Sequence, residues 1–463
     1  MKAMKKNQLI QSLIGIAVPM LAGAAMLWLS WRKWPDVQVD FGMSLYIPWR
    51  LNEGEVLYRD IAWFFGPLSH YFNACLFRLF GTGMMTIATG NMTLVTILCI
   101  LIYRFFLKTI DRLTAACAVT TFLTIFAFSQ YGGRIANWNW VCPYTPEVPH
   151  GIILSIAAIY FFSNFIKDGK PVWWLPVGIL AGMAALTKSE VFLAAAIALG
   201  SGFIGYLWTR KPSRRLTVLA IGLGLGGFLI PITGFILFMT RHLGFSKAAA
   251  SLIRPYLYLF DSAVTANPFF SSVQGMDKPW TNLTALLESA GICGFVILIL
   301  VMLGWLHRRL EEPAHKTVMT VSVTALLLLA GPALAYTIPW LSIARPLPLA
   351  TAGIVIYYAV TFIRGRNDRD IVNTALPLFV FSMFSLILMA KIILNAKIYR
   401  YGFALAMPAS LMIAAALIHL LPSRLATSLA TRRFLQKVSV ILLGIVLTGH
   451  VLSALPVLLV KTF

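Results

Sequence analysis

The stretch from residue 150 to residue 209 decides the fold class. It reads as three apolar runs in close succession: HGIILSIAAIYFFSNFI (150–166), VWWLPVGILAGMAALT (172–187) and EVFLAAAIALGSGFIGYLWT (190–209). A helix needs roughly 20 apolar residues to cross the ~30 Å hydrocarbon core of a bilayer. The runs lack the period-two alternation of a membrane β-barrel. Backbone groups in lipid must be hydrogen-bonded within their own segment, so these runs predict transmembrane helices.

The same pattern extends over the whole chain. Of its 463 residues, 59% are hydrophobic and 12% are charged, about half the charged fraction of an ordinary soluble protein. The apolar runs predict thirteen spans, at 9–30, 86–107, 113–130, 150–166, 172–187, 190–209, 216–240, 284–306, 317–339, 346–363, 371–393, 402–421 and 436–459. We therefore expect an all-α, polytopic membrane protein with about thirteen transmembrane helices.

The charged residues predict its orientation. A net charge of +22 would suit a nucleic-acid-binding protein, but the basic residues lie in short tracts between apolar runs, so we expect a bilayer and no nucleic acid as partner. With the N-terminus in the cytoplasm, the cytoplasmic segments hold 22 of the 38 lysines and arginines and 6 of the 16 acidic residues. This agrees with the positive-inside rule and places residues 31–85, 131–149, 241–283 and 394–401 outside.

The stretch at 63–80 (WFFGPLSHYFNACLFRLF) is apolar but interrupted by Gly66-Pro67, His70, Asn73 and Arg78. Counting it as a span would reverse the orientation of the later loops. We interpret it as an amphipathic interfacial helix in the first external loop, lying on the outer surface of the membrane.

The first external loop also carries acidic residues that topology does not require. Five carboxylates fall in it, interleaved with aromatic residues: Asp36, Asp40, Glu53, Glu55 and Asp60. This composition indicates a partly buried structure that bears acids, which is the setting in which a general base is tuned. The alternative, that any one of them is an ordinary polar residue of a loop, stays open.

The order of the motifs resembles the GT-C superfamily of polyprenyl-phosphate-sugar glycosyltransferases, of the lipid A aminoarabinose transferase or protein O-mannosyltransferase (family 39-like) type. The resemblance covers residues 1–215 and is weak afterwards. The residues that carry it are Asp40, Gly54-(x)3-Tyr58-Arg59-Asp60, Gly66-Pro67-Leu68, Leu79-Phe80-Gly81, Ala185-Leu186-Thr187-Lys188 and, later, Arg400-Tyr401. The commonest version of the family has Asp-Glu or Asp-x-x-Arg-Tyr after the first helix. Here Phe41-Gly42 follows Asp40, so Asp36, Asp40 and Asp60 all remain candidates for the base.

The resemblance implies an inverting transfer of a sugar from a polyprenyl-phosphate donor to an envelope lipid, glycan or protein, on the external face of a bacterial inner membrane. It assigns catalytic roles to Asp40, Glu147 and Asp60. The donor phosphate would be bound by Lys188, Arg59, Arg345 and Arg400, and the substrates by Tyr46, Tyr58, His70 and Tyr401. A lysine at membrane depth without a task would cost about 2.5–3.5 kcal/mol, which favours Lys188, although a snorkelling lysine is the alternative.

We expect two modules: residues 1–240 with the catalytic apparatus and the loop at 31–85, and residues 241–463 with an external loop at 241–283 that shapes the acceptor side. No cofactor is certain. A divalent metal at Glu147 and His150 is possible but not favoured, because no HxxxH-type spacing supports it. The competing function is a transporter or a flippase for a lipid-linked glycan, although the paired repeats typical of transporters are not visible. A non-catalytic envelope scaffold is the third option.

Overall fold

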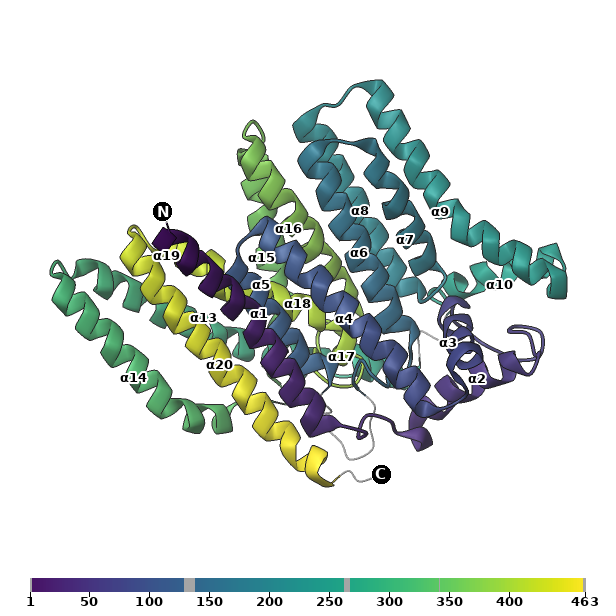
Figure 1. The fold of residues 1–463 in the computed structure, drawn as a ribbon, viewed down its shortest axis with the longest axis horizontal. Helices are drawn as coiled ribbons and strands as arrows, with labels where there is room; N and C mark the ends of the chain where they lie inside the picture. The colour runs from purple at the N-terminus through teal and green to yellow at the C-terminus, as the bar shows by residue number, and fades with distance from the viewer. Residues whose placement is uncertain (1, 129–137, 262–266, 341, 461–463) are drawn as a thin grey trace.

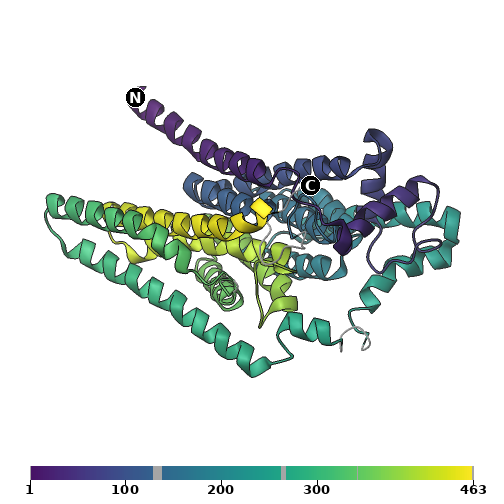
Figure 2. The ribbon, with the colours of Figure 1, turned by 90° about the horizontal axis from the view of Figure 1, so that it is seen from below.

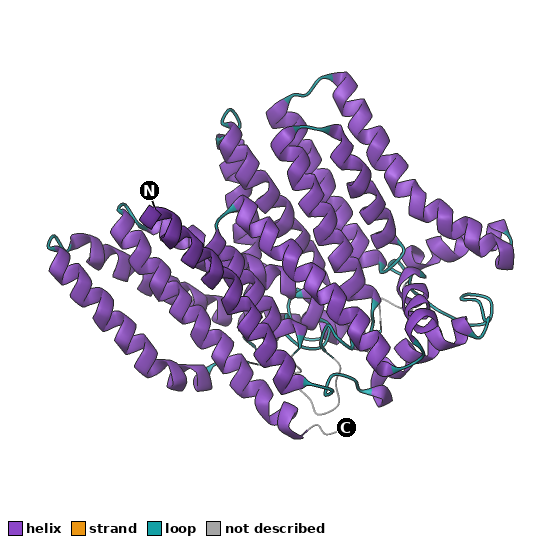
Figure 3. Ribbon diagram, viewed as in Figure 1, coloured by secondary structure: helices purple, strands orange, loops and turns teal. Residues whose placement is uncertain are grey.

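The computed structural model describes residues 2–128, 138–261, 267–340 and 342–460, which form helices joined by short loops (Figure 3). Among the described residues, ten helices are long and apolar enough to cross a membrane, and three shorter apolar helices accompany them. Each of the thirteen predicted spans overlaps one of these helices. The predicted all-α, polytopic membrane fold is confirmed.

The first half of the chain forms the helices that lie at the right and centre of Figure 1, and its first helix, α1, begins toward the left, where N is marked. Their bounds are α1 (Lys2–Ser30), α2 (Gly42–Asn52), α3 (Leu68–Phe80), α4 (Met84–Thr109), α5 (Arg112–Thr121), α6 (Glu147–Asp168), α7 (Trp174–Ala185), α8 (Ser189–Arg210), α9 (Arg214–Leu243) and α10 (Phe245–Leu257). A short π-helical segment, η1 (Val37–Phe41), leads into α2, and η2 (Phe122–Ala127) continues α5. The first external loop is therefore helical over much of its length, with α2 and α3 in it.

The second half of the chain completes the bundle. Its helices are α12 (Pro268–Gln274), α13 (Pro279–Arg309), α14 (Pro313–Thr337), α15 (Leu347–Arg364), α16 (Arg369–Leu388), α17 (Gly402–Leu405), α18 (Met407–Ala415), α19 (Leu421–Leu425) and α20 (Leu429–Val460). A 3-10 turn, η4 (Met389–Ile392), extends α16, and η5 (Ala416–Leu420) joins α18 to α19.

The core lies where α4, α6, α8 and α16 meet. The rings of Phe105 on α4 and Phe381 on α16 stack with 4.9 Å between their centroids. Gly202 on α8 allows a close approach, because a Cβ atom there would lie 2.3 Å from a methyl group of Val380 and 2.8 Å from the ring of Phe162. Small residues at helix contacts are a common packing device in membrane proteins. By contrast, α9, α13 and α14 expose most of their apolar side chains, as expected for helices that face lipid.

The segments on the two sides of the predicted membrane collect at opposite edges of the bundle. In Figure 1 the α8–α9 and α15–α16 connections, which carry basic residues, lie at the upper edge. The helices α2, α3, α10 and α17 gather toward the lower edge. Figure 2 shows this lower side extending from α2 and α10 at one end to α13 and α14 at the other. The candidate site residues outside the transmembrane helices therefore share one side of the molecule.

Candidate functional site

Two of the sequence motifs meet through backbone hydrogen bonds. The N–H of Gly66 donates to the carbonyl of Thr187 at 2.7 Å, and the N–H of Leu68 donates to the carbonyl of Leu186 at 3.0 Å. A Cβ atom at position 66 would lie 2.2 Å from the Leu186 oxygen, so this approach requires glycine. The contact holds the start of α3 against the turn between α7 and α8, where Lys188 is the next residue.

Lys188 is buried at this turn, directly before α8, with 2% of its surface exposed. Its Nζ lies 3.7 Å from the centroid of the Phe65 ring, a cation–π geometry, and 3.8 Å from Oε1 of Glu190. Burial lowers the pKa of Lys188 to about 8, while the carboxylates of Glu190 and Glu147 act in the opposite direction. The ammonium group is thus held in a desolvated place and loses its proton more easily than an exposed lysine.

A second lysine, which the sequence analysis did not select, completes this cluster. Nζ of Lys391, in η4, donates to Oε1 of Glu190 at 2.8 Å and lies 4.5 Å from the centroid of the Tyr401 ring. Glu190 therefore lies between two ammonium groups. Lys391 falls inside the predicted span at 371–393, and an ionisable residue within a span is itself a signal of function that would have pointed to it.

Asp40 faces the same cluster through two tyrosines. The rings of Tyr144 and Tyr401 contact each other with 5.6 Å between their centroids. Burial raises the pKa of Tyr144 well above its ordinary value, and the charges of Glu190 and Asp40 add to this effect. Burial also raises the pKa of Tyr401, where Lys391 opposes and Glu190 and Asp40 reinforce the shift. Tyr401 is therefore the side chain on which the charges of Asp40, Glu190 and Lys391 all act.

The backbone at Asp40 is strained. Its φ angle is +57°, in the left-handed region that non-glycine residues rarely adopt. Such outliers are concentrated at functional sites, where the surrounding structure maintains them. Its carboxylate remains exposed to solvent, while the protein packed against it raises its pKa by desolvation. A carboxyl group with a raised pKa that still has access to solvent can accept a proton from a bound substrate.

Glu147, the predicted second acid, is fully buried at the start of α6. Its Oε1 accepts a hydrogen bond from Nε1 of Trp63 at 3.0 Å, and its Oε2 accepts one from Oγ1 of Thr145 at 2.7 Å. Nε2 of His70 lies 3.1 Å from Oε1. His70, assigned by resemblance to the substrates, is itself fully buried against this carboxylate. The arrangement anchors the first external loop on α6.

Arg59 and Asp60 pair with each other at the surface. Nη2 of Arg59 lies 2.8 Å from Oδ2 of Asp60, which also accepts the backbone N–H of Val56 at 2.8 Å. These hydrogen bonds, the one from Arg59 first, hold the pKa of Asp60 below its usual value. Asp60 is thus a weaker base than Asp40, whose pKa is shifted the other way.

The two candidate tyrosines of the loop have different surroundings. Tyr58, also at positive φ (+69°), donates its hydroxyl proton to the carbonyl of Phe65 at 2.6 Å. Tyr46 on α2 is half exposed, and the guanidinium carbon of Arg50 lies 6.0 Å from its ring centroid. Tyr58 therefore holds the loop beside the phenylalanine that covers Lys188, and Tyr46 presents an aromatic surface.

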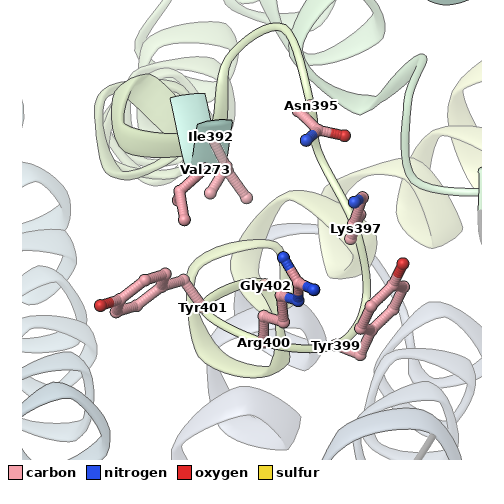
Figure 4. A pocket seen from close by; sticks show the side chains of 8 residues that line it. All are labelled: Val273, Ile392, Asn395, Lys397, Tyr399, Arg400, Tyr401 and Gly402. Carbon is pink, nitrogen blue, oxygen red and sulfur yellow. The ribbon is translucent and has the colours of Figure 1, made fainter. Parts of the chain in front are cut away.

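Of the predicted cations of the second half, Arg400 lines a small pocket together with Lys397, Tyr399 and Tyr401 (Figure 4). Burial lowers the pKa of Lys397, and the charges of Arg400 and Arg345 add to this shift. Arg400 has a positive φ of +53°, and Nη1 of Arg345 donates to Oδ1 of Asn282 at 3.4 Å. Figure 4 shows Arg400 between Tyr399 and Tyr401. The site thus contains a second, more exposed group of positive charges, which Tyr401 connects to Lys391.

Both ring nitrogens of His150 contact neutral side chains. Its Nδ1 lies 3.0 Å from Oγ of Ser69, and its Nε2 lies 3.3 Å from Oδ1 of Asn91. Over the described ranges, no three His, Cys, Asp or Glu side chains are grouped closely enough to hold a metal ion. His150 connects α6 to α3 and α4.

The family model of dolichyl-phosphate-mannose-protein mannosyltransferases matches residues 65–238, which include the Gly66 and Lys188 motifs. The apo oligosaccharyltransferase of Archaeoglobus fulgidus aligns over 96% of this chain, with 12% identity and a TM-score of 0.52. No curated protein matches the sequence.

ArnT from Cupriavidus metallidurans also aligns, in its apo state and bound to undecaprenyl phosphate. The alignments cover 87% of this chain and 77% of that chain, with identities of 14% and 13%. Their TM-scores of 0.34 and 0.37 are too low to define a shared fold.

The family model thus matches a segment of the first half of the chain, and the archaeal structure shares the polytopic helical fold of the whole chain. The chain spans 56% of the length of that archaeal oligosaccharyltransferase.

Proposed function

We propose that this protein is an inverting glycosyltransferase of the bacterial inner membrane. It takes a sugar from a polyprenyl-phosphate donor and transfers it to an envelope lipid, glycan or protein on the external face. The observation that carries this proposal is the Lys188–Glu190–Lys391 cluster, in which Lys188 is buried and the other two side chains are partly buried. The charges of Glu190, Lys391 and the exposed Asp40 all act on the same side chain, Tyr401.

The cluster supplies what the leaving group needs. When the bond to the sugar breaks, negative charge accumulates on the lipid phosphate, and fixed cations in a desolvated site stabilise it. Glu190 neutralises only one of the two ammonium groups, so Lys188 and Lys391 together retain one net positive charge. Arg400 and Arg345 add further charge near Tyr399. We assign the donor phosphate to the space between the lysine cluster and the two arginines. Arg59 is a weaker candidate, because it already pairs with Asp60.

Asp40 is the proposed general base. Its carboxylate would accept the proton of the acceptor hydroxyl or amine as that group attacks the anomeric carbon. The positive φ at Asp40 indicates that the fold maintains an unfavourable backbone there in order to aim this side chain. Glu147, buried among Trp63, Thr145 and His70, supports the site by holding the loop. Tyr46 and Tyr58 frame the entrance for the substrates.

In this proposal the two modules of the chain supply different residues of the site. Residues 1–240 contribute Asp40, Lys188 and Glu190, and residues 241–463 contribute Lys391 and the Arg400 pocket. Donor binding would therefore require both modules, and we assign the segment at 241–283 to the acceptor side. The excess of lysine and arginine in the segments predicted to be cytoplasmic supports the external location.

Mass spectrometry of envelope lipids and glycans tests this function directly. Cells that express the wild-type protein should contain a product heavier by one sugar residue, and this product should be missing from cells that lack the protein or carry Asp40→Asn. Purified protein in nanodiscs should then form the product from an extracted polyprenyl-phosphate sugar. Accumulation of a sugar-linked lipid on one leaflet, with no new glycosylated product, would instead support the flippase alternative.

A further inference from the structure

A groove of about 760 Å³ lies far from the candidate active site, between α14, α20 and the start of α5. Its lining residues are Leu113, Thr320, Val321, Thr324, Ala325, Leu328, Arg433, Gln436, Lys437, Val440 and Ile441. On α20 the lining positions recur with the spacing of one helix face. The groove lies at the periphery of the bundle, on the side of α14 and α20 that appears at the left of Figure 1.

The lining of the groove changes from polar to apolar along its length. Arg433, Gln436 and Lys437 lie near the N-terminal end of α20, and Thr320 lies near the N-terminal end of α14. One turn or more further along each helix, the lining becomes apolar: Val440 and Ile441 on α20, and Ala325 and Leu328 on α14. A polar, cationic end followed by an apolar channel parallel to the helices matches the shape of a membrane lipid.

Within the described ranges, the cations at the polar end have no acidic partner. Arg433 and Lys437 are both exposed, lie four residues apart on the same face, and form no ion pair with any carboxylate in the described ranges. A guanidinium and an ammonium group side by side attract a phosphate oxygen, and basic pockets between transmembrane helices bind anionic lipid headgroups. The charge therefore selects among lipids, while the apolar end accepts any acyl chain.

We propose that this groove binds an anionic glycerophospholipid of the bilayer. Its phosphate lies between Arg433 and Lys437, and an acyl chain lies along Val440, Ala325 and Leu328. The site is independent of the transfer reaction, since it shares no residue with the Asp40 and Lys188 cluster.

We expect lipid binding to stabilise the position of α14, whose main packing partner is α20. A Cβ atom at Gly331 on α14 would lie 3.2 Å from Ile445 on α20, so these two helices are in close contact at their distal halves. The groove lies at their other ends. A lipid bound there fills the space between the two helices and connects them to Leu113 on α5.

The test is native mass spectrometry and thermal unfolding of the full chain in nanodiscs of phosphatidylcholine, with and without phosphatidylglycerol. The wild-type protein should retain phosphatidylglycerol in preference to phosphatidylcholine and unfold at a higher temperature in its presence. The double variant Arg433→Gln/Lys437→Gln should lose this retention, with an affinity about 10- to 30-fold weaker, and lose the thermal shift. The matched control is Arg214→Gln/Arg215→Gln, which removes the same charge from exposed positions at the start of α9 and should behave like the wild type.

A second variant keeps the test valid if the double variant is poorly folded. Leu328→Trp fills the apolar end without changing any charge and should also reduce retention of phosphatidylglycerol. The proposal is overturned if both sets of variants retain the lipid as the control does. It is also overturned if phosphatidylcholine is retained equally well, or if a polyprenyl phosphate displaces phosphatidylglycerol at equal concentration, which would make the groove a binding site for the carrier lipid.

Discussion

Lys391 and Glu190 form an ion pair of 2.8 Å between Nζ and Oε1, although 201 residues separate them in the chain. The pair joins η4 to the first turn of α8 and brings a second ammonium group beside Lys188. Glu190 is the only carboxylate that the described structure places in direct contact with these two lysines. One carboxylate balances one ammonium group, so removing either lysine removes the net positive charge of the proposed phosphate site.

The Lys391→Ala variant tests how much this charge contributes to sugar transfer. We expect its rate of sugar transfer to fall about 10²-fold, the usual effect of removing one electrostatic contact to a transition state. Lys391→Arg should recover part of the rate, because the charge is kept while reach and geometry differ. Steady-state kinetics in nanodiscs measure the effect, with Lys170→Ala, an exposed lysine at the opposite edge, as the control. A wild-type rate for Lys391→Ala would exclude this residue from the site.

The Asp40→Asn variant should reduce turnover by about 10²–10⁴-fold, the contribution of a general base. The substitution keeps the shape of the side chain but removes its ability to accept a proton, so donor binding should change little. Asp36→Asn and Asp60→Asn separate this role from packing of the loop. If Asp60→Asn were inactive while Asp40→Asn transferred sugar normally, the base would be Asp60. Activity in all three variants would contradict the proposed glycosyltransferase function.

Transfer should depend on pH through Lys188, whose pKa burial lowers to about 8. Below this pH the side chain is protonated and can neutralise the donor phosphate. As the pH rises through about 8 the charge is lost, so donor affinity should fall on the alkaline side. The Lys188→Arg variant should not show this alkaline loss, because arginine remains charged. Donor binding measured from pH 6 to pH 10 tests the expectation, and the same alkaline loss in both proteins would contradict it.

At low pH, protonation of the proposed base, Asp40, should limit the rate of transfer. Burial raises the pKa of Asp40, so its carboxylate takes up a proton at a higher pH than an exposed aspartate, and transfer should fall as the pH drops through this raised pKa. The wild-type rate should therefore show a bell-shaped profile. In Asp40→Asn the residual rate should lose its acidic limb, which a rate profile at saturating donor can detect.

The Gly66→Ala variant should destabilise the protein and impair the site together. A Cβ atom 2.2 Å from the Leu186 carbonyl oxygen must displace either the start of α3 or the α7–α8 turn. We expect a loss of about 1–3 kcal/mol in stability, as for overpacked sites, with reduced donor affinity because Lys188 moves with the turn. Gly83→Ala is the matched control, since nothing lies within 4 Å of its added Cβ atom. Unfolding temperature and donor binding should be measured for both.

The sequence alone was sufficient for the all-α membrane architecture. Each apolar run such as 150–166 must form its backbone hydrogen bonds within itself in lipid, so local composition specifies the helix without reference to its neighbours. The Gly66, Lys188 and Arg400 motifs were also visible, because glycine next to proline and cations next to helix ends are local signals. Lys391 also carried a local signal, as an ionisable residue within an apolar run, but no neighbour in the sequence indicated its partner.

What only the tertiary structure decided is which of these residues act together. Transmembrane helices pack through surfaces that are similarly apolar on all sides, so the sequence of α8 does not specify that η4 lies beside it, nor that Glu190 meets Lys391. The same holds for Asp40, whose left-handed backbone and proximity to Tyr401 depend on contacts between distant segments. The sequence by itself determined that the chain forms membrane helices with acids and cations between them. The packing of those helices decided that Asp40, Glu190 and Lys391 act on the same side chain, Tyr401, because charges separated by up to 351 positions influence one group only after the helices that carry them have come into contact.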